Sequence, residues 1–409
     1  MPLSPARIRL ALLALALGGF GIGCTEFAAM GVLPDLARDL LPEAYARSPE
    51  EANGQAGALI AAYALGVVVG APTIAAFAAR FPRKRLLLGL VGLIVVATVA
   101  SAVLPSFGWV FAARFVSGLP HGAYFGIASL VAANLLGPDK RGQGAAFVLS
   151  GLTIANVVGV PAITWLGLHY GWRASMLAVA CLFVLTFLAV SLLVPRQQGD
   201  TSSTLRSELR VFKRGQVWFA LGIGSVGFGG LFAVFTYVSP IATEVTGLAT
   251  AAVPLVLVAF GIGMTLGNFA GGWFADRGTE RALLAGFGLV LVALMALLLT
   301  VHTVVGLFAC LFLLGAAVAG GAVVIQVRLL DVAGTGSQTI AAAVNHSALN
   351  VGNTMGAALG GAVVAAGFGY LAPIWVGIAL TIGGIGLAVT SFAVERRSTR
   401  SSLDLAGPE

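Results

Sequence analysis

The chain has 409 residues, of which 58% are hydrophobic and only 10% are charged. A soluble domain carries about 25% charged residues, so this composition excludes a single water-soluble globule with a polar surface. The formal net charge of +7 does not indicate nucleic acid as a partner, because the basic residues lie in short segments between apolar runs and form no stripe interleaved with aromatic residues.

Twelve apolar stretches follow one another along the chain, each apolar on every side and long enough for a helix that crosses a bilayer. The first six predicted spans cover residues 10–33, 55–79, 86–104, 109–136, 143–168 and 173–194. The second six cover residues 216–240, 251–275, 282–301, 304–327, 338–366 and 372–394. This pattern predicts an all-α membrane protein with twelve transmembrane helices in a lipid bilayer.

The only long polar stretch between predicted spans follows Pro195. We interpret residues 196–215 as a cytoplasmic linker between two six-helix bundles, 1–195 and 216–395, and residues 396–409 as a cytoplasmic tail. With both termini in the cytoplasm, 19 of the 23 basic residues fall on the inner side, three fall on the outer side and Arg114 lies within a span. This excess of inner Lys and Arg predicts the orientation.

Two segments of the chain recur at a displacement of 197 residues. The first set is Gly66, Gly70, Phe77, Ala78 and Arg80, which recurs as Gly263, Gly267, Phe274, Ala275 and Arg277. The second set is Ser150, Leu152, Asn156 and Gly159, which recurs as Ser347, Leu349, Asn353 and Gly356. Because two distant segments share one displacement, we infer duplication of a six-helix unit, as in secondary transporters with parallel halves.

The end of the second predicted span and the loop that follows it have the sequence GVVVGAPTIAAFAARFPRKR, residues 66–85. This stretch resembles the signature loop of the major facilitator superfamily, in which Gly-rich helix ends lead to an acidic residue, an arginine and a short basic turn. The first copy departs from that pattern at Ala79, where the family has an acidic residue, whereas the second copy keeps Asp276 and Arg277.

Three further stretches resemble motifs of the drug:proton antiporter-1 branch of this superfamily. They are GCTEFAAMGVLPDLARDL (residues 23–40), ARFVSGLPHGAYFG (113–126), and GLTIANVVGVP (151–161) followed by GWR (171–173). Together they look most like those of arabinose and sugar efflux permeases. The resemblance implies two pseudo-symmetric six-helix bundles, a monomer without cofactors, and export of a small-molecule substrate in exchange for protons.

Glu26 and Arg114 are ionisable residues within predicted spans, where burial costs several kcal/mol. At 1.5 Å per residue, they lie roughly 10 Å and 8 Å from the outer ends of their spans. Since the family's fold places the first and fourth spans beside the central cavity, the resemblance implies that the two side chains face each other across it, with Glu26 as the proton carrier. The alternative is a static ion pair that only fixes helix register.

His121 follows Arg114 by seven residues and therefore shares its helical face, nearer the bilayer centre. We group it with Glu26 and Arg114 as a candidate proton-coupling residue, because an imidazole could relay protons or bind substrate. A single intramembrane histidine could equally be hydrogen-bonded to a neighbouring helix.

The eleventh predicted span carries one polar face, on which Asn345, His346, Asn350 and Asn353 fall within about 140° of one another. Asn156 in the fifth span is the repeat-related partner of Asn353. These five residues are the candidate substrate-binding groups, since amides suit hydroxyl-rich or heterocyclic cargo. Bonding of the amides to neighbouring helices is the alternative.

Charged residues at the cytoplasmic ends of spans are candidates for gating, through ion pairs and helix-end contacts that hold one face closed. They are Arg80, Arg83, Lys84, Asp276 and Arg277. For the basic turn, simple orientation of the helix is the alternative. Asp35 and Asp39 lie beyond the outer end of the first span, where we expect solvation.

Other chemistries find little support in the sequence. The three cysteines, Cys24, Cys181 and Cys310, lie within apolar runs and indicate neither a disulfide framework nor a metal site. No P-loop, H-E-x-x-H or G-x-S-x-G sequence occurs, so neither ATP-driven transport nor hydrolysis by those machineries is indicated.

We therefore predict a proton-coupled exporter of sugars or drugs in a bacterial inner membrane, which works by alternating access. Uptake by proton symport is the main alternative. An intramembrane enzyme would need a nucleophile and a base at matched depth, and a membrane sensor would need an output domain, neither of which the sequence indicates. The sequence does not identify the cargo.

Overall fold

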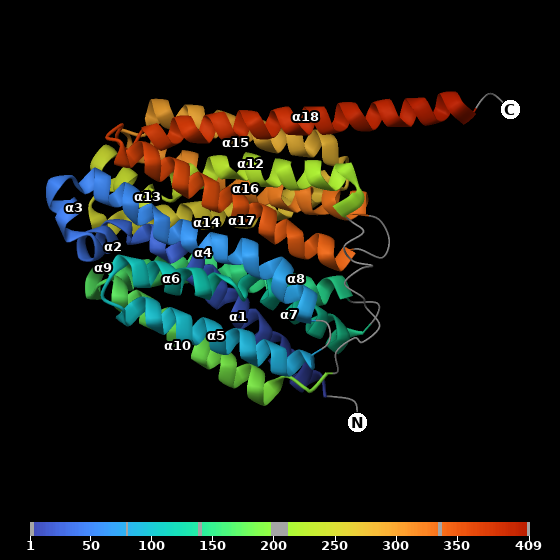
Figure 1. The fold of residues 1–409 in the computed structure, drawn as a ribbon, viewed down its shortest axis with the longest axis horizontal. Helices are drawn as coiled ribbons and strands as arrows, with labels where there is room; N and C mark the ends of the chain where they lie inside the picture. Colours follow the sequence, from blue (N-terminus) through green and yellow to red (C-terminus); the bar gives the residue numbers. More distant parts are fainter. Residues whose placement is uncertain (1–3, 79–80, 138–140, 198–211, 334–337, 407–409) are drawn as a thin grey trace.

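The computed structural model describes residues 4–78, 81–137, 141–197, 212–333 and 338–406. Within these ranges twelve helices are long and apolar enough to cross a membrane, which confirms the predicted number of spans. They run along the long axis of the molecule, and the first described helix begins at the same end of the bundle at which the last one finishes (Figure 1).

Helices α1 to α10 form what we call the first half, and α12 to α18 form the second half. The spans of the first half are α1 (Pro5–Gly31), α4 (Pro49–Ala78), α5 (Arg83–Val103), α6 (Phe107–Gly118) with α7 (His121–Leu136), α8 (Arg141–Ile154) with η2 (Ala155–Gly159) and α9 (Val160–Tyr170), and α10 (Trp172–Leu193). Those of the second half are α12 (Gly215–Phe235), η5 (Thr250–Ala252) with α14 (Val253–Ala275), α15 (Thr279–Thr300), α16 (Val304–Ala333), α17 (Gln338–Ala365) and α18 (Ala372–Ala406).

The helix ends differ most from the predicted spans where polar residues continue a helix beyond the bilayer. Helix α4 begins at Pro49 rather than at residue 55, and α18 continues to Ala406 rather than ending at residue 394. Figure 1 shows α18 projecting past the rest of the bundle. Hydropathy locates the part of a helix that suits lipid, whereas the hydrogen-bonded helix can extend into water on either side.

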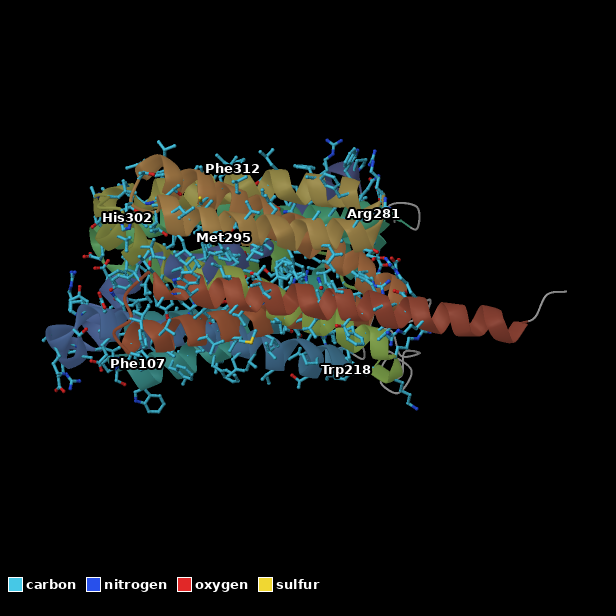
Figure 2. The ribbon with its side chains drawn as sticks, turned by 90° about the horizontal axis from the view of Figure 1, so that it is seen from above. Phe107, Trp218, Arg281, Met295, His302 and Phe312 are labelled. Carbon is cyan, nitrogen blue, oxygen red and sulfur yellow. The ribbon has the colours of Figure 1, made fainter. Side chains whose placement is uncertain are left out.

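The outer surface of the bundle carries many large apolar side chains, as expected of a surface in contact with lipid. Trp218 is 58% exposed and Met295 is 54% exposed. In Figure 2, Arg281 lies near one end of the bundle and His302 lies at the other. Arg281 and His302 thus mark the two ends of the bundle that α15 spans, and the cytoplasmic location of the Arg281 end stays a prediction.

Two spans are interrupted near their centres. The fourth is divided between α6 and α7, with Leu119 and Pro120 between them. The fifth contains the π-helical turn η2 directly before Pro161, where the Val160 N–H bonds to the Ala155 carbonyl. Pro161 has no N–H for a regular helix, and the helix accommodates it with a wider turn, a feature frequent at functional sites.

Two short helices, α2 (Leu33–Leu40) and α3 (Pro42–Arg47), follow the first span at the outer end. We expected Asp39 to be solvated, and its side chain is about half exposed. It also accepts a hydrogen bond from Trp172 Nε1 at 3.0 Å and pairs with Arg173 at 2.9 Å. Trp172 and Arg173 of the GWR sequence therefore connect the start of α10 to α2.

Helix α4 packs against α6 at backbone distance through glycine. A Cβ atom on Gly66 would lie 2.1 Å from the Phe115 carbonyl oxygen, and one on Gly70 would lie 2.0 Å from that of Leu119. Such distances are far below van der Waals contact, so only glycine allows this approach.

Helix α14 packs against α16 in the same way. A Cβ atom on Gly263 would lie 2.1 Å from the Phe312 carbonyl oxygen, and one on Gly267 would lie 2.1 Å from that of Ala316. A displacement of 197 residues relates these four residues to Gly66, Gly70, Phe115 and Leu119, which form the α4–α6 contact. The internal repeat inferred from sequence therefore extends to the packing of the helices.

The two halves meet mainly along two pairs of spans: α4 with α17, and the fifth span (η2 and α9) with α14. Most of the predicted linker, residues 198–211, lies outside the described residues. The exact division of the chain into 1–195, 196–215, 216–395 and 396–409 therefore stays a prediction.

We predict that Gly267→Val destabilises the protein by about 1–3 kcal/mol, because the new side chain would collide with the α16 backbone. Gly272→Val is the matched control, since a Cβ on Gly272 of the same helix meets no atom within 4 Å. Thermal unfolding of the purified protein in detergent measures both. Equal melting temperatures for the two variants would contradict the close contact.

Candidate functional site

Ionisable side chains gather at the centre of the described spans. Glu26 of α1 is 7% exposed, Arg114 of α6 is 3% exposed and His121 of α7 is 2% exposed. His346 of α17 lies against His121, with the ring centroids 6.2 Å apart. Since the hydrocarbon core offers no water to such groups, their partners must come from the protein.

Glu26 contacts the second half of the molecule. Its Oε1 accepts a hydrogen bond from Asn353 Nδ2 of α17 at 3.4 Å. The next residue, Phe27, packs its ring against Phe232 and Phe235 of α12, with centroids 6.5 Å and 6.1 Å away. Glu26 therefore lies where α1 meets helices of the second half.

Arg114 binds the residue beside Glu26. Its Nη1 donates to Thr25 Oγ1 at 3.2 Å, and its Nη2 donates to the Thr25 carbonyl at 3.1 Å. Its guanidinium carbon lies 4.6 Å from the centre of the Tyr63 ring, which is a cation–π arrangement. In the described part of the chain it makes no ion pair with Glu26, so the static ion pair named as the alternative is not seen, and the role of Glu26 as proton carrier stays a prediction.

His121 and Arg114 share one partner, as expected of residues on the same helical face. The Tyr63 hydroxyl lies 3.1 Å from His121 Nδ1, and its ring carries the Arg114 guanidinium. Tyr63, which lies on α4 and is 1% exposed, therefore links two of the predicted proton-coupling residues.

His346 is placed by aromatic packing across the two halves. Its ring stacks on Phe125 of α7 with centroids 5.5 Å apart and an interplanar angle of 5°. Phe125 also meets His121 edge-on at 5.4 Å. The histidines of α7 and α17 thus both pack against one phenylalanine, which is 2% exposed.

The asparagines on the predicted polar face of α17 bond to different partners. Asn345 Nδ2 donates to Gln326 of α16 at 2.8 Å, which is the helix-to-helix bonding named as the alternative. Asn350 Nδ2 bonds to the His346 carbonyl of its own helix, and Asn353 reaches Glu26. The Oδ1 atoms of Asn350 and Asn353 are buried and have no hydrogen-bond partner among the described residues.

Asn156 does not repeat the contact of Asn353, its repeat-related partner. Its Nδ2 donates to the Leu152 carbonyl of its own span at 3.0 Å, at the π-helical turn η2. The two amides therefore occupy related positions in the two halves but bond differently.

The predicted gating residues lie at the cytoplasmic ends of their helices. Lys84 Nζ donates to the Ser191 carbonyl of α10 at 2.7 Å, and the Arg83 N–H bonds to the Gln197 carbonyl at 3.1 Å, so both contacts stay within the first half. Arg277 bonds to the Trp273 carbonyl and covers its ring, while Asp276 is exposed. Arg80 lies outside the described residues.

A further buried cation at this end was not singled out from the sequence. Arg328 of α16 is 9% exposed and pairs with Glu395 of α18 at 2.5 Å. Its Nη2 also donates to Gln216 Oε1 of α12 at 3.4 Å, and Ser391 donates to the same oxygen. This cluster joins three spans of the second half.

The comparisons with known proteins identify the family. The sequence profile of the Major Facilitator Superfamily matches residues 15–304 and 239–407. The chain belongs to this superfamily. The resemblance drawn from residues 66–85 is confirmed, and the chain is a multi-pass membrane transporter of small molecules rather than an enzyme.

Three relatives align over most of their length. The chain is 36% identical over 364 residues to the inner membrane transport protein YdhP of Escherichia coli (strain K12), covering 89% of this chain and 91% of that protein. It is 33% identical over 366 residues to the chloramphenicol resistance protein of Streptomyces lividans (88% and 91%). It is 25% identical over 357 residues to the probable sugar efflux transporter of Helicobacter acinonychis (strain Sheeba) (87% and 89%).

The fold also matches a solved structure. The crystal structure of a D-xylose–proton symporter superposes with a TM-score of 0.72 over 92% of this chain and 97% of that chain, at 16% sequence identity. This similarity establishes the transporter fold with its two six-helix bundles.

We predict that Tyr63→Phe lowers the stability by about 1 kcal/mol, the net value of one hydrogen bond, here the bond to His121. Tyr63→Leu should cost about 1–2 kcal/mol more, because Arg114 also loses the aromatic face beneath its guanidinium. Thermal unfolding in detergent measures both variants. If Tyr63→Phe were as unstable as Tyr63→Leu, the cation–π contact would contribute nothing to the stability of the protein.

Proposed function

We propose that this transporter exports small molecules, sugars or drugs, across a bacterial inner membrane in exchange for protons, and that it works as a monomer by alternating access. The observation that carries the proposal is the contact between Glu26 and Asn353. It places a buried carboxylate between the two halves that must move relative to each other during transport.

Asn353 can serve as a partner of Glu26 in both protonation states. An ionised carboxylate would accept the hydrogen bond that Asn353 Nδ2 donates to Glu26 Oε1. A protonated carboxyl group is a donor, and the Asn353 Oδ1, which is buried without a partner among the described residues, is an acceptor. Proton uptake would therefore exchange a charge-assisted contact between α1 and α17 for a weaker neutral one.

Arg114 and His121 supply the electrostatic surroundings of this carboxylate. Arg114 is held on Thr25, next to Glu26, so its charge can act on the carboxylate without forming a locked ion pair. A locked pair would resist protonation, whereas a nearby unpaired charge leaves the carboxylate free to exchange protons. His121, bonded to Tyr63, would extend the proton path along α7 toward His346.

The cargo site would lie beside this network. His346 of α17 would supply an imidazole, and Asn350 and Asn353 would supply the buried Oδ1 atoms that have no partner among the described residues. We place Asn156 and Asn345 at the margin of the site, where their Nδ2 atoms bond to Leu152 and Gln326. Phe125 and His346 form a stacked surface that suits planar cargo. Gating at the cytoplasmic end would use Arg80, Arg83, Lys84, Asp276 and Arg277.

Export is favoured over uptake by the names of two relatives, one a chloramphenicol resistance protein and the other a probable sugar efflux transporter. The motif over residues 151–161, which contains η2 and resembles that of antiporters, supports the same direction. Uptake by proton symport is the second candidate, and the fold shared with a D-xylose–proton symporter favours it.

The decisive variant is Glu26→Gln, which keeps the shape of the side chain but cannot ionise. In proteoliposomes we expect cargo-dependent proton movement to fall by about tenfold or more, the size of a typical coupling between two sites. The assay adds chloramphenicol, sugars and nucleosides in turn and follows an internal pH indicator. Glu43→Gln, at an exposed carboxylate of α3, is the control and should behave as the unmodified protein. Proton movement that survived in Glu26→Gln with its usual pH dependence would remove Glu26 as the carrier.

Variants of the two repeat-related asparagines distinguish proton coupling from cargo binding. We expect Asn353→Ala to lower the number of protons moved per cargo, since it removes the partner of Glu26 on α17. Asn156→Ala, whose amide bonds only to its own helix, should change the concentration of cargo at half-maximal transport and leave the proton ratio unchanged. Identical effects of the two variants on the proton ratio would argue against the role of Asn353.

A further inference from the structure

The seventh span is interrupted at its outer end, where α12 stops at Phe235. The Tyr237 N–H bonds to a carbonyl three residues back along the chain, so the helical turn is tighter here. Pro240 has no N–H to offer the Thr236 carbonyl, and a regular α-helix cannot continue through this segment. A short helix, α13 (Val238–Pro240), follows and packs against α1 and α2 of the first half (Figure 1). The interruption therefore places Tyr237 where the two halves meet.

The Tyr237 hydroxyl lies between two carbonyl groups, one from each half. It is 3.1 Å from the Ala357 oxygen of α17 and 3.4 Å from the Gly54 oxygen of α4. A tyrosine hydroxyl has a single O–H donor, so the two carbonyl oxygens share one proton. Tyr237 is 0% exposed, and its hydroxyl therefore forms a buried polar contact between α4 and the second half.

Glycines on α4 and α17 leave the space that this hydroxyl fills. A Cβ atom on Gly57 would lie 1.9 Å from Tyr237 Oη, and one on Gly361 would lie 2.5 Å from it. Both distances are far below van der Waals contact, so a side chain at either position would displace the tyrosine. We call the space between Gly54, Gly57 and Gly361 the glycine notch.

We propose that Tyr237 is a gating residue, whose hydroxyl holds α4 in the glycine notch when the halves are closed at the outer end and loses α4 when they separate. The hydroxyl keeps its Ala357 acceptor in both states, because α12 and α17 belong to the same half. Opening therefore breaks one long hydrogen bond without leaving a buried donor unsatisfied, which would cost more. Such a contact can form and break in every transport cycle.

Alternating access requires a closure at each end of the bundle. The gating residues predicted from the sequence all belong to the end at which Arg83 and Lys84 begin α5, and Tyr237 supplies a closure at the opposite end. This role rests on the alternating access proposed above. It depends neither on the identity of the cargo nor on proton coupling at Glu26.

The test measures how often Ser239, two residues after Tyr237, becomes accessible. Ser239 is 1% exposed and lies on α13, which packs against the first half, so a cysteine there should react with a charged maleimide only while the halves are apart. When opening and closing are fast, the rate of labelling follows the open population. The reporter is the purified full chain with Ser239→Cys, in which the three native cysteines are replaced: Cys24→Ala, Cys181→Ala and Cys310→Ala.

In this reporter, Tyr237→Phe removes the hydroxyl, keeps the ring and should raise the rate of labelling about fivefold, as expected for the loss of one hydrogen bond. Tyr45→Phe is the matched control, because this hydroxyl of the outer end accepts its bond from Arg38 of the same half. Its rate should stay within about twofold of the unmodified reporter. Labelling of Tyr237→Phe at the rate of Tyr45→Phe would overturn the gating role.

A second variant tests the glycine notch. Gly57→Ala should raise the rate about tenfold, because the added methyl group would collide with Tyr237 Oη. In Gly57→Ala/Tyr237→Phe the colliding oxygen is absent, so the rate should return to about that of Tyr237→Phe alone. If the two effects instead multiplied in the double variant, the notch would not act through Tyr237 and the proposal would fail. If Gly57→Ala did not fold, the comparison of Tyr237→Phe with Tyr45→Phe would still decide.

A second reporter distinguishes separation of the halves from local unfolding. It keeps Cys310 as its one cysteine, which is 4% exposed and lies beside Thr300 within the second half. Tyr237→Phe should leave the labelling of Cys310 unchanged, and an increase equal to that at Ser239→Cys would overturn the gating role. These rates need neither cargo nor a proton gradient, so a failure of proton-coupled export would appear only in the proteoliposome assay of Glu26→Gln.

Discussion

The structure depends on the absence of water from the hydrocarbon core, because every ionisable or polar group held there must find its partners in the protein. Arg114 meets this constraint in part, with the two oxygens of Thr25 and the ring of Tyr63, while its Nε has no hydrogen-bond partner among the described residues. Tyr63 in turn bonds to His121, and Glu26 bonds to Asn353. The partners lie on α1, α4, α6, α7 and α17, so the polar groups that lipid would exclude hold the centre of the bundle together.

Glycine provides the second condition, since it lets helices pack at backbone distance. The contact of Gly66 with the α6 backbone recurs at Gly263 with α16. Within each half these contacts make a closely packed unit, in which side chains cannot rearrange without displacing the main chain. Glycine also brings the two halves to backbone distance, since a Cβ on Gly261 would lie 2.2 Å from the Asn156 carbonyl oxygen. At the centre, Glu26 and Asn353 connect the halves through a hydrogen bond of 3.4 Å.

The twelve spans and the internal repeat could be predicted because they rest on composition, length and spacing, which the bilayer constrains strongly. The burial of Glu26, Arg114 and His121 followed from the same constraint. The partner of Arg114 could not be predicted, since Thr25 and Glu26 are adjacent and the choice depends on side-chain rotamers. Tyr63 was missed because its ring counts as hydrophobic, although its hydroxyl is what reaches His121.

The outer end of the bundle suggests how proton coupling could control the opening of the halves. There the closure between the halves includes neutral hydrogen bonds, Asn53 with Tyr370 and Tyr237 with Gly54, each worth about 1 kcal/mol. The free energy of the hydrogen bond between Glu26 and Asn353 differs by about 1–2 kcal/mol between a charged and a neutral carboxyl group. This difference is comparable to the free energy of one of the outer hydrogen bonds. Under the proposed coupling, a single protonation event at Glu26 would therefore be large enough to change the balance between closed and open states.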